Sequence, residues 1–309
     1  MQPIWIGIDG GGTKVKAVAA TERGEIIAEA ISGPCNIAAV GASASFHSVN
    51  VAISQLLNSG SFQLSDINSI AIGVAGYSHV SSRVQFHQLL RNTFPSINIS
   101  LFPDFVLAYH GAFAHNPGVV VIAGTGSLAY GVAADGTSAR KGGYGHLLDD
   151  GGSGYGIGRQ AILAVLSHAH GSGPPTLLTE AVLSCIGSNS VDDIVPAVYG
   201  GSLDRLHIAA LASGVMSLAE SENDSVSIGI IQSAASTLAA HAADVFTRLH
   251  QSDRCKIACV GGMWQPNRLL LCSFEEELIN LVGSCEVFVS HDSPEMGAVR
   301  LARQGAPIV

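Results

Sequence analysis

The sequence predicts an α/β protein with two similar domains. Short apolar runs rich in Val and Ile alternate with segments whose apolar residues recur at helical spacing, which is the pattern of α/β folds. A strand, a glycine-rich turn and a second strand occur near the N-terminus and again around residues 119–133. A length of 309 residues accommodates two domains of ordinary size. Two similar domains facing each other across a cleft would account for the repetition.

The first half of the chain alternates strands and helices. Three short apolar runs joined by turns predict strands over 4–9, 15–21 and 25–30. Phe46, Val49 and Ile53 then recur at the spacing of one helix face. In order, the pattern predicts a helix over 42–58, a strand over 70–74, a helix over 79–92, a strand over 97–102 and a helix over 105–114.

The second half begins with the same strand pattern and continues mainly as helix. Extended segments are predicted over 119–123, 128–133, 139–141, 256–260 and 286–290, and helices dominate 153–251, with a long alanine-rich one over 228–250. A final helix begins near Pro294, because proline is favoured in a first turn. We expect one domain over 1–115 together with the C-terminal helix 294–309, and a second over 116–293.

The turn Asp9-Gly10-Gly11-Gly12-Thr13-Lys14 is a candidate phosphate-binding loop, since glycines let backbone N–H groups approach an anion closely. A dinucleotide fingerprint or a P-loop needs a helix directly after the glycines. Here the β-branched run 15–20 predicts a strand, and none of the four lysines (14, 16, 141 and 256) follows a glycine. The turn therefore joins two antiparallel strands. Gly124-Thr125-Gly126-Ser127 repeats this arrangement further along the chain.

Composition excludes several classes of partner. The net charge is −9 and there is no basic run, which argues against nucleic acid or an anionic membrane as a partner. No charged leader opens the chain, and no apolar run reaches the ~20 residues of a membrane span. The six cysteines are scattered, and the close pair Cys255 and Cys259 is typical of small side chains on a strand. We expect a cytoplasmic protein with reduced thiols.

Further candidate residues lie at predicted strand ends and in glycine-rich segments. Asp104 follows the strand 97–102 and begins a helix, so it is either an N-cap or a general base that takes a hydroxyl proton. The window 142–156 combines many glycines with two aspartates and two tyrosines, as a sugar would need. Gly261-Gly262 follows a strand and could let an adenine lie flat against backbone.

The order of these segments resembles the superfamily of sugar kinases, heat-shock chaperones and actin. More narrowly, Gly143-Tyr144-Gly145-His146 with Asp150, Gly152-Ser153 and Tyr155 resembles the N-acetylglucosamine kinase branch of the BadF/BadG/BcrA/BcrD-type ATPase family. The resemblance covers essentially the whole chain. It implies two ribonuclease H-like domains, ATP and Mg²⁺ as cofactors, and 6-phosphorylation of an amino sugar such as N-acetylglucosamine.

The resemblance also implies a role for individual residues. Asp104 would be the catalytic base, and Asp9 would hold Mg²⁺ through water. Sugar contacts would come from Asn36, Asp104, Gly143, Tyr144, Gly145 and Asp150. ATP contacts would come from Gly11, Gly12, Thr13, Lys14, Gly124, Thr125, Gly126, Ser127, Ala209, Gly261 and Gly262.

The chain departs from the family motif at one place, and alternative substrates and functions remain open. The family usually has Gly-Asp-Glu-Gly-Ser where this chain has Asp149-Asp150-Gly151-Gly152-Ser153, which leaves the sugar open. Glucosamine and N-acetylmuramic acid are alternative substrates, and a homodimer is left open. Two alternatives of another class are an ATPase that activates a CoA-dependent dehydratase through an iron–sulfur cluster, for which no matching cysteine pair is found, and a non-catalytic ATP or sugar sensor.

Overall fold

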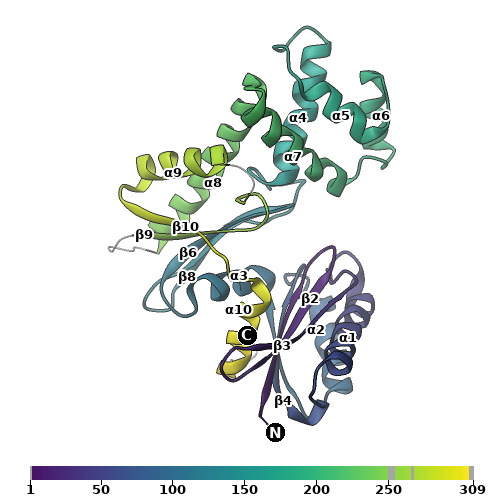
Figure 1. Ribbon diagram of the computed structural model, residues 1–309, viewed down its shortest axis with the longest axis vertical. Coiled ribbons are helices and arrows are strands. Elements are labelled where there is room, and N and C mark those ends of the chain that lie inside the picture. The colour runs from purple at the N-terminus through teal and green to yellow at the C-terminus, as the bar shows by residue number, and fades with distance from the viewer. Residues whose placement is uncertain (1, 250–254, 266–267, 306–309) are drawn as a thin grey trace. The chain divides into compact units, whose positions relative to one another are not determined.

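A computed structural model of the chain describes residues 2–249, 255–265 and 268–305. It divides into two compact units. Unit 1 comprises Met1–Asn116 and Ser290–Val309, and unit 2 comprises Pro117–Val289. Figure 1 shows the course of the chain, in which the C-terminal segment returns to the unit that the N-terminus begins. Each unit is a sheet covered by helices.

The sheet of unit 1 has the strand order β3-β2-β1-β4-β5. Its strands are β1 (Ile4–Gly10), β2 (Val15–Thr21), β3 (Ile26–Ser32), β4 (Ile67–Val74) and β5 (Asn98–Pro103). Strands β1, β2 and β3 are antiparallel neighbours, whereas β4 and β5 continue the sheet parallel to β1. The register pairs Asp9 with Lys16 and Gly10 with Val15. The glycine turn therefore joins two antiparallel strands, as its sequence predicts.

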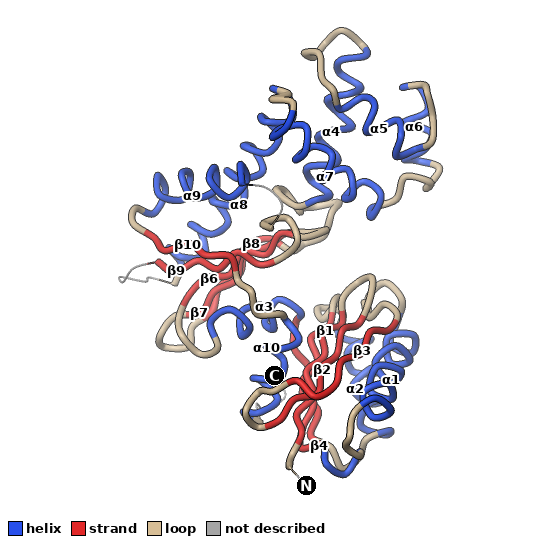
Figure 2. The backbone as a smooth tube through the Cα atoms, viewed as in Figure 1, coloured by secondary structure: helices blue, strands red, loops and turns tan. Residues whose placement is uncertain are grey.

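Helices cover both faces of this sheet (Figure 2). Helices α1 (Gly41–Ser59) and α2 (Val80–Thr93) pack on one face, and α3 (Asp104–Phe113) and α10 (Pro294–Gln304) pack on the other. A 3-10 turn, η1, spans Leu64–Asp66. Helix α10 lies so close to β1 that a side chain at Gly7 would collide with the backbone of Glu295 and Val299. The buried hydroxyl of Ser69 on β4 donates to the carbonyl of Ala302, 2.6 Å away.

The sheet of unit 2 repeats this topology. Its order is β10-β9-β6-β7-β8, with β6 (Gly118–Ala123), β7 (Ser127–Val132), β8 (Ser138–Gly142), β9 (Cys255–Val260) and β10 (Cys285–Val289). The first three strands along the chain are again antiparallel neighbours, and the last two again extend the sheet in parallel. The fold class predicted from the sequence, α/β with two similar halves, is confirmed.

Unit 2 carries more helices than unit 1. They are α4 (Gly154–Ala169), α5 (Leu178–Ile186), α6 (Ile194–Tyr199), α7 (Arg205–Ser221), α8 (Ser225–Arg248) and α9 (Arg268–Val282), with a 3-10 turn η2 at Val191–Asp193. Helix α4 packs along α7, and α8 packs along α9. The sequence pattern did not predict α9, although its buried residues Leu270, Phe274 and Leu278 recur every fourth position.

No apolar segment long enough to span a membrane was expected from the sequence, and helix α8 differs from this expectation. Its most apolar 18-residue stretch has a mean hydropathy of 1.2, so by length and composition it is the one helix of the described residues that could cross a membrane. Its buried side, which includes Ile231, Ala235 and Leu238, belongs to the main hydrophobic core of unit 2. The apolar character of α8 is thus used in packing against the sheet and the neighbouring helices.

Candidate active site

The glycine turn of unit 1 is fixed by its neighbours and presents its tip to solvent. The N–H of Gly11 donates to the carbonyl of Lys14 (3.0 Å), and the N–H of Cys35 donates to the carbonyl of Gly11 (2.9 Å). Gly12, Thr13 and Lys14 are exposed, and no atom lies within 4 Å of where a side chain on Gly12 would begin. The turn can therefore offer backbone N–H groups and one ammonium to an anion.

Asp9 ends β1 directly before this turn, in a strongly acidic environment. Its pKa is raised from 3.8 to about 7, first by burial and then by the negative charges of Asp104 and Glu295, while Lys16 and Lys14 act in the opposite direction. The sequence predicted Asp9 and Asp104 as functional carboxylates. The structure places Asp104 near enough for its charge to raise the pKa of Asp9, and Glu295 is an acidic neighbour that sequence reasoning missed.

Asp104 is the first residue of α3 and follows directly on β5. Pro103 is the N-cap of α3. Asp104 is therefore not the N-cap, which was one of the two roles that its sequence position allowed. Its Oδ1 accepts a hydrogen bond from the N–H of Phe105 at 2.9 Å. Because β1, β4 and β5 run parallel, Asp9 and Asp104 both lie at the carboxyl edge of the sheet, where open α/β sheets bind ligands.

Asn36 lies in the loop after β3 and makes a single parallel bridge to Ala75. Its Oδ1 accepts the N–H groups of Ala38 and Ala39, each at 3.1 Å. Within the described part of the chain no acceptor is found for its side-chain NH₂. In a sugar site Asn36 would therefore act as a hydrogen-bond donor.

The second glycine turn, in unit 2, is tied to the start of α4. The N–H of Gly154 donates to the carbonyl of Gly124 (2.8 Å), and the N–H of Tyr155 donates to the carbonyl of Thr125 (3.3 Å). Ser127 is buried, and its hydroxyl donates to the carbonyl of Gly151 at 2.7 Å. Gly124, Thr125 and Gly126 are partly exposed, so they are the members of this turn that a ligand can reach.

Three segments predicted to bind ATP meet at Gly154. A Cβ on this glycine would lie 3.1 Å from the carbonyl oxygen of Ala209, 3.2 Å from that of Gly124 and 3.4 Å from the sulfur of Met263. The phosphate turn, helix α7 and the segment that follows β9 thus converge on the first turn of α4. Gly261 has φ +110°, which only glycine adopts readily, and a side chain there would collide with Ala123.

The predicted sugar segment contains an unusual aspartate. Asp150 has φ +67° and is buried, at 2% exposed. Its Oδ1 accepts the N–H of Ser127 at 3.1 Å, and its Oδ2 pairs with the guanidinium of Arg205 at 3.3 Å. A left-handed conformation in a residue other than glycine stores strain that the surrounding contacts must hold. Asp150 therefore connects the sugar segment to the phosphate turn and to α7.

Arg205 was not found from the sequence. It is the first residue of α7, directly after the N-cap Asp204, and its Nη2 would lie 3.1 Å from a side chain on Gly126. A cation at a helix N-terminus is unfavourable for the helix dipole. This unfavourable position is the one feature of the sequence that indicates an ion-pair partner for Arg205 outside its own helix.

The start of the predicted sugar segment consists of glycines with positive φ and an exposed tyrosine. Gly142, Gly143 and Gly145 all have φ between +75° and +87°, where a side chain would be strained. The ring of Tyr144 is 61% exposed, and the guanidinium of Arg140 lies 5.3 Å from its centre.

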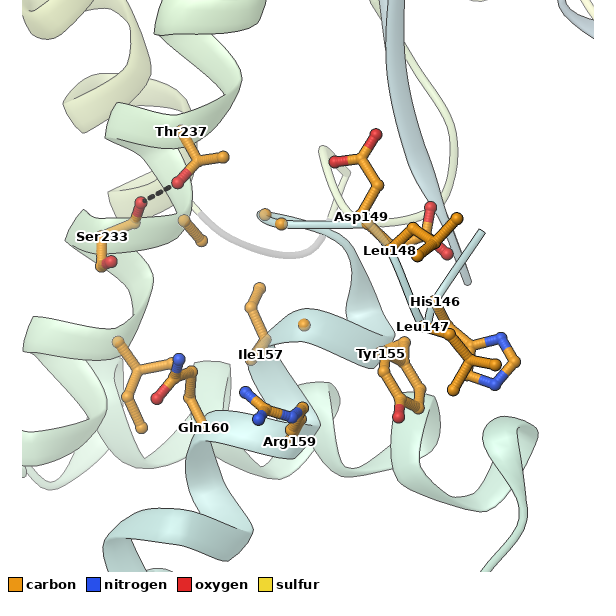
Figure 3. A pocket seen from close by; sticks show the side chains of 16 residues that line it. His146, Leu147, Leu148, Asp149, Tyr155, Ile157, Arg159, Gln160, Ser233 and Thr237 are labelled. Atoms are coloured by element: carbon orange, nitrogen blue, oxygen red, sulfur yellow. Dashed lines mark hydrogen bonds between the residues drawn. The ribbon is translucent and has the colours of Figure 1, made fainter. Parts of the chain in front are cut away.

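A cavity of about 510 Å³ adjoins this segment within unit 2 (Figure 3). Its walls come from the sugar segment and from α4 and α8, and they include His146, Asp149, Asp150, Gly151, Tyr155, Arg159, Gln160, Ser233 and Thr237. His146 packs edge-on against Tyr155 with ring centres 5.0 Å apart. The walls mix these groups with the apolar side chains of Leu147, Leu148, Ile157, Ile230 and Ala234, and one lining side chain, that of Arg159, is cationic.

Metal-ligating side chains do not form a cluster around the candidate site or elsewhere in the described residues. Among the described residues, no group of three or more His, Cys, Asp or Glu side chains is arranged to hold an ion. Mg²⁺ typically uses one or two carboxylates and keeps several waters, so Asp9 at the exposed glycine turn fits this mode.

Solved structures share this two-domain fold. A structure from Chromobacterium violaceum, named as a candidate N-acetylglucosamine kinase, has a TM-score of 0.79 at 23% identity and covers 97% of this chain and 99% of its own. A ROK family glucokinase from Streptomyces griseus, in complex with glucose and AMPPNP, has a TM-score of 0.61 at 18% identity and covers 97% and 99%. The fold is therefore that of two-domain sugar kinases.

A match to a family model identifies the family to which the chain belongs within this fold class. The model of the BadF/BadG/BcrA/BcrD ATPase family matches residues 6–301, and the chain belongs to that family. It is 29% identical over 303 residues to the N-acetylmuramic acid/N-acetylglucosamine kinase of Clostridium acetobutylicum, covering 96% of this chain and 97% of the relative. It is 27% identical over 310 residues to the N-acetyl-D-glucosamine kinase of Dictyostelium discoideum, covering 97% of each. Membership of an ATPase family makes ATP the nucleotide to consider.

Proposed function

We propose that the chain transfers the γ-phosphoryl group of ATP to the 6-hydroxyl of an amino sugar, with N-acetylglucosamine as the preferred substrate. The observation that carries this proposal is the placement of Asp104 at the carboxyl end of β5, at the same sheet edge as Asp9 and its glycine turn. A carboxylate beside a phosphate-binding turn is the pair of elements that a sugar kinase requires. The names of the relatives support the choice of sugar.

In this proposal unit 1 provides the chemistry. Asp104 accepts the proton of the attacking hydroxyl, and a positioned base of this kind contributes roughly 10²–10⁴-fold to the rate. Gly12, Thr13 and Lys14 bind phosphate oxygens through backbone N–H groups and one ammonium, while Gly11, whose N–H donates to the carbonyl of Lys14, holds the turn in shape beside the phosphates. Asp9 holds Mg²⁺ through water, and the ion when bound neutralises charge on the phosphates. Asn36 donates its side-chain NH₂ to the sugar.

Unit 2 provides the rest of the nucleotide and sugar contacts. The turn Gly124–Ser127 binds phosphate, with Ser127 shaping the turn from its buried position. Ala209 and Gly261-Gly262 contact the adenine side, in keeping with their convergence near Gly154. Gly143, Tyr144, Gly145 and Asp150 contact the sugar. Both oxygens of Asp150 already accept protein donors, so a sugar hydroxyl would use the remaining lone pairs of this carboxylate.

The two compact units are proposed to be the two domains of this kinase, which works in the cytoplasm on a small sugar. Phosphoryl transfer needs positioning and charge neutralisation more than covalent help from the protein, and it benefits when water is excluded. A homodimer is compatible with the proposal but no part of it depends on one.

A second substrate is favoured by one observation. The cavity beside the sugar segment contains the guanidinium of Arg159, which has no carboxylate within 4 Å in the described part of the chain. An arginine in that place suits a sugar that carries a carboxylate. N-acetylmuramic acid is such a sugar, and it is in the name of the Clostridium relative. Glucosamine, named for a Vibrio cholerae relative 32% identical over 191 residues (62% of this chain, 64% of that relative), carries no such group.

The test is ADP release in a coupled assay with N-acetylglucosamine, N-acetylmuramic acid, glucosamine, N-acetylmannosamine and glucose. We expect the largest kcat/KM with N-acetylglucosamine. Activity on N-acetylmuramic acid that falls selectively in an Arg159→Met variant would support the second substrate. If no sugar stimulates ADP release, the proposed function is wrong. Iron in protein purified anaerobically would instead favour the dehydratase-activator class.

A further inference from the structure

Glu295 is a buried acid for which the proposed function has no use so far. It is the second residue of α10 and is 9% exposed. One of its oxygens, Oε1, lies 4.0 Å from the ammonium of Lys16. The other, Oε2, is buried without any hydrogen-bond partner in the described part of the chain. A buried carboxylate oxygen that lacks a partner is costly to the fold, so its retention points to a ligand.

Asp9 and Glu295 lie on the same side of the unit 1 sheet. Gly7 and Asp9 lie on one face of β1, because residues two apart in a strand share a face. Gly7 contacts the backbone of Glu295, which fixes α10 on that face. Lys16 is the cross-strand partner of Asp9 and therefore points to the same side. Asp9, Lys16 and Glu295 thus belong to one group of charges under the start of α10.

This group has an excess of negative charge. Asp104 also acts on Asp9, so three carboxylates are balanced by the ammonium groups of Lys16 and Lys14. Oxygen-rich, acidic sites of this kind suit Mg²⁺ or Mn²⁺. Because no three acidic side chains in the described ranges are arranged to ligate an ion directly, the ion would keep most of its water. Water molecules on the ion would then supply the donor that Glu295 Oε2 lacks.

We propose that Glu295 is the second acidic residue of a hydrated divalent-cation site centred on Asp9, and that Lys16 weakens the affinity of this site. The inference extends the proposed function, in which the cation accompanies ATP. It differs from a structural explanation in which Glu295 only neutralises the N-terminus of α10 and pairs with Lys16. That explanation leaves Oε2 without a partner and gives it no contact with water on a bound ion.

The experiment measures binding of Mn²⁺ alone to the full chain, without nucleotide or sugar, from the loss of the free Mn²⁺ signal in electron paramagnetic resonance. Glu295→Gln keeps the shape of the side chain and removes its charge. We expect it to weaken Mn²⁺ binding roughly 10-fold, as is usual for residues that act on a metal through its ligands. Lys16→Met should strengthen binding by several-fold, because it removes a cation from the same group.

Glu29→Gln is the matched control, since Glu29 is an exposed acid of β3 in the same unit. It should bind Mn²⁺ as the parent does. Circular dichroism establishes that each variant is folded. Unchanged affinity in Glu295→Gln, or no gain in Lys16→Met, overturns the inference, and the second variant decides the matter if the first does not fold. The readout needs no sugar, so an absence of kinase activity would refute the proposed function without touching this result.

Discussion

The carboxylate of Asp150 joins the guanidinium of Arg205 to the phosphate turn, because its second oxygen accepts the amide of Ser127. Asp150 is buried and Arg205 is partly exposed, with its Nε buried and unpartnered among the described residues. Two segments separated widely in sequence are therefore coupled through one acid. The coupling places a positive charge next to Gly126.

Arg205→Met should destabilise the protein. It leaves the buried carboxylate of Asp150 with one donor fewer, and an under-satisfied buried group costs about 1–3 kcal/mol. Urea unfolding followed by circular dichroism measures this loss. Arg159→Met, which removes an exposed arginine with no carboxylate partner among the described residues, should change stability much less. Equal losses of unfolding free energy in the two variants would show that the Asp150–Arg205 pair does not stabilise the protein.

Asp104→Asn should abolish most of the turnover and leave ATP binding intact. The amide cannot take the hydroxyl proton, so kcat should fall roughly 10²–10⁴-fold. The coupled assay gives kcat, and fluorescence titration with a labelled ATP analogue gives the affinity. Turnover close to that of the parent would remove Asp104 from the mechanism.

Gly154→Ala should weaken ATP binding selectively. A methyl group at this position would press on the carbonyl groups of Ala209 and Gly124, which belong to two predicted ATP segments. Gly229→Ala is the matched control, because Gly229 also lies in a helix and nothing lies within 4 Å of its added Cβ. The control should gain about 0.5–1 kcal/mol of stability and keep its KM for ATP. A similar KM for ATP in the two variants would contradict the predicted nucleotide site.

The stability of unit 2 should fall as the solution becomes acidic through the titration of His241. Burial lowers the pKa of this histidine below its usual 6.5, and Lys141 lowers it further, while Asp149 and Asp244 act in the opposite direction. Near and below pH 6.5 the unfolded chain therefore binds a proton that the folded chain resists, so stability is lost as the pH falls.

His241→Gln removes this contribution. The difference in melting temperature between the parent and His241→Gln, measured by calorimetry from pH 8 to pH 5, should shift in favour of the variant as the pH falls. A difference that does not vary with pH would assign the acid sensitivity to other groups.

The sequence was sufficient for features that depend on local pattern. The two strand–glycine turn–strand units are confirmed, as is the position of Asp104 at a strand end, because strand periodicity and glycine content are local properties. Cys259 is buried on β9, as a small strand residue should be, whereas the side chain of Cys255 lies outside the described residues.

Features that depend on distant packing could not be predicted. Arg205 acquires its role from an aspartate 55 positions away, and Glu295 acquires its role from the way α10 lies on β1. The sequence pattern assigned a role to neither residue. Helix α9 was also missed, although Leu270, Phe274 and Leu278 form an uninterrupted apolar stripe on it.

Helix α10 also has a consequence for the order in which the chain can fold during synthesis. Domains generally fold as units as the chain emerges from the ribosome. Unit 2 is continuous and is complete once Val289 is free, whereas one face of the unit 1 sheet, with Trp5 and Val18, is covered by α10, which follows unit 2 in the sequence. The sheet of unit 1 is translated first and must therefore wait, with apolar surface uncovered, until all of unit 2 and then α10 have been made.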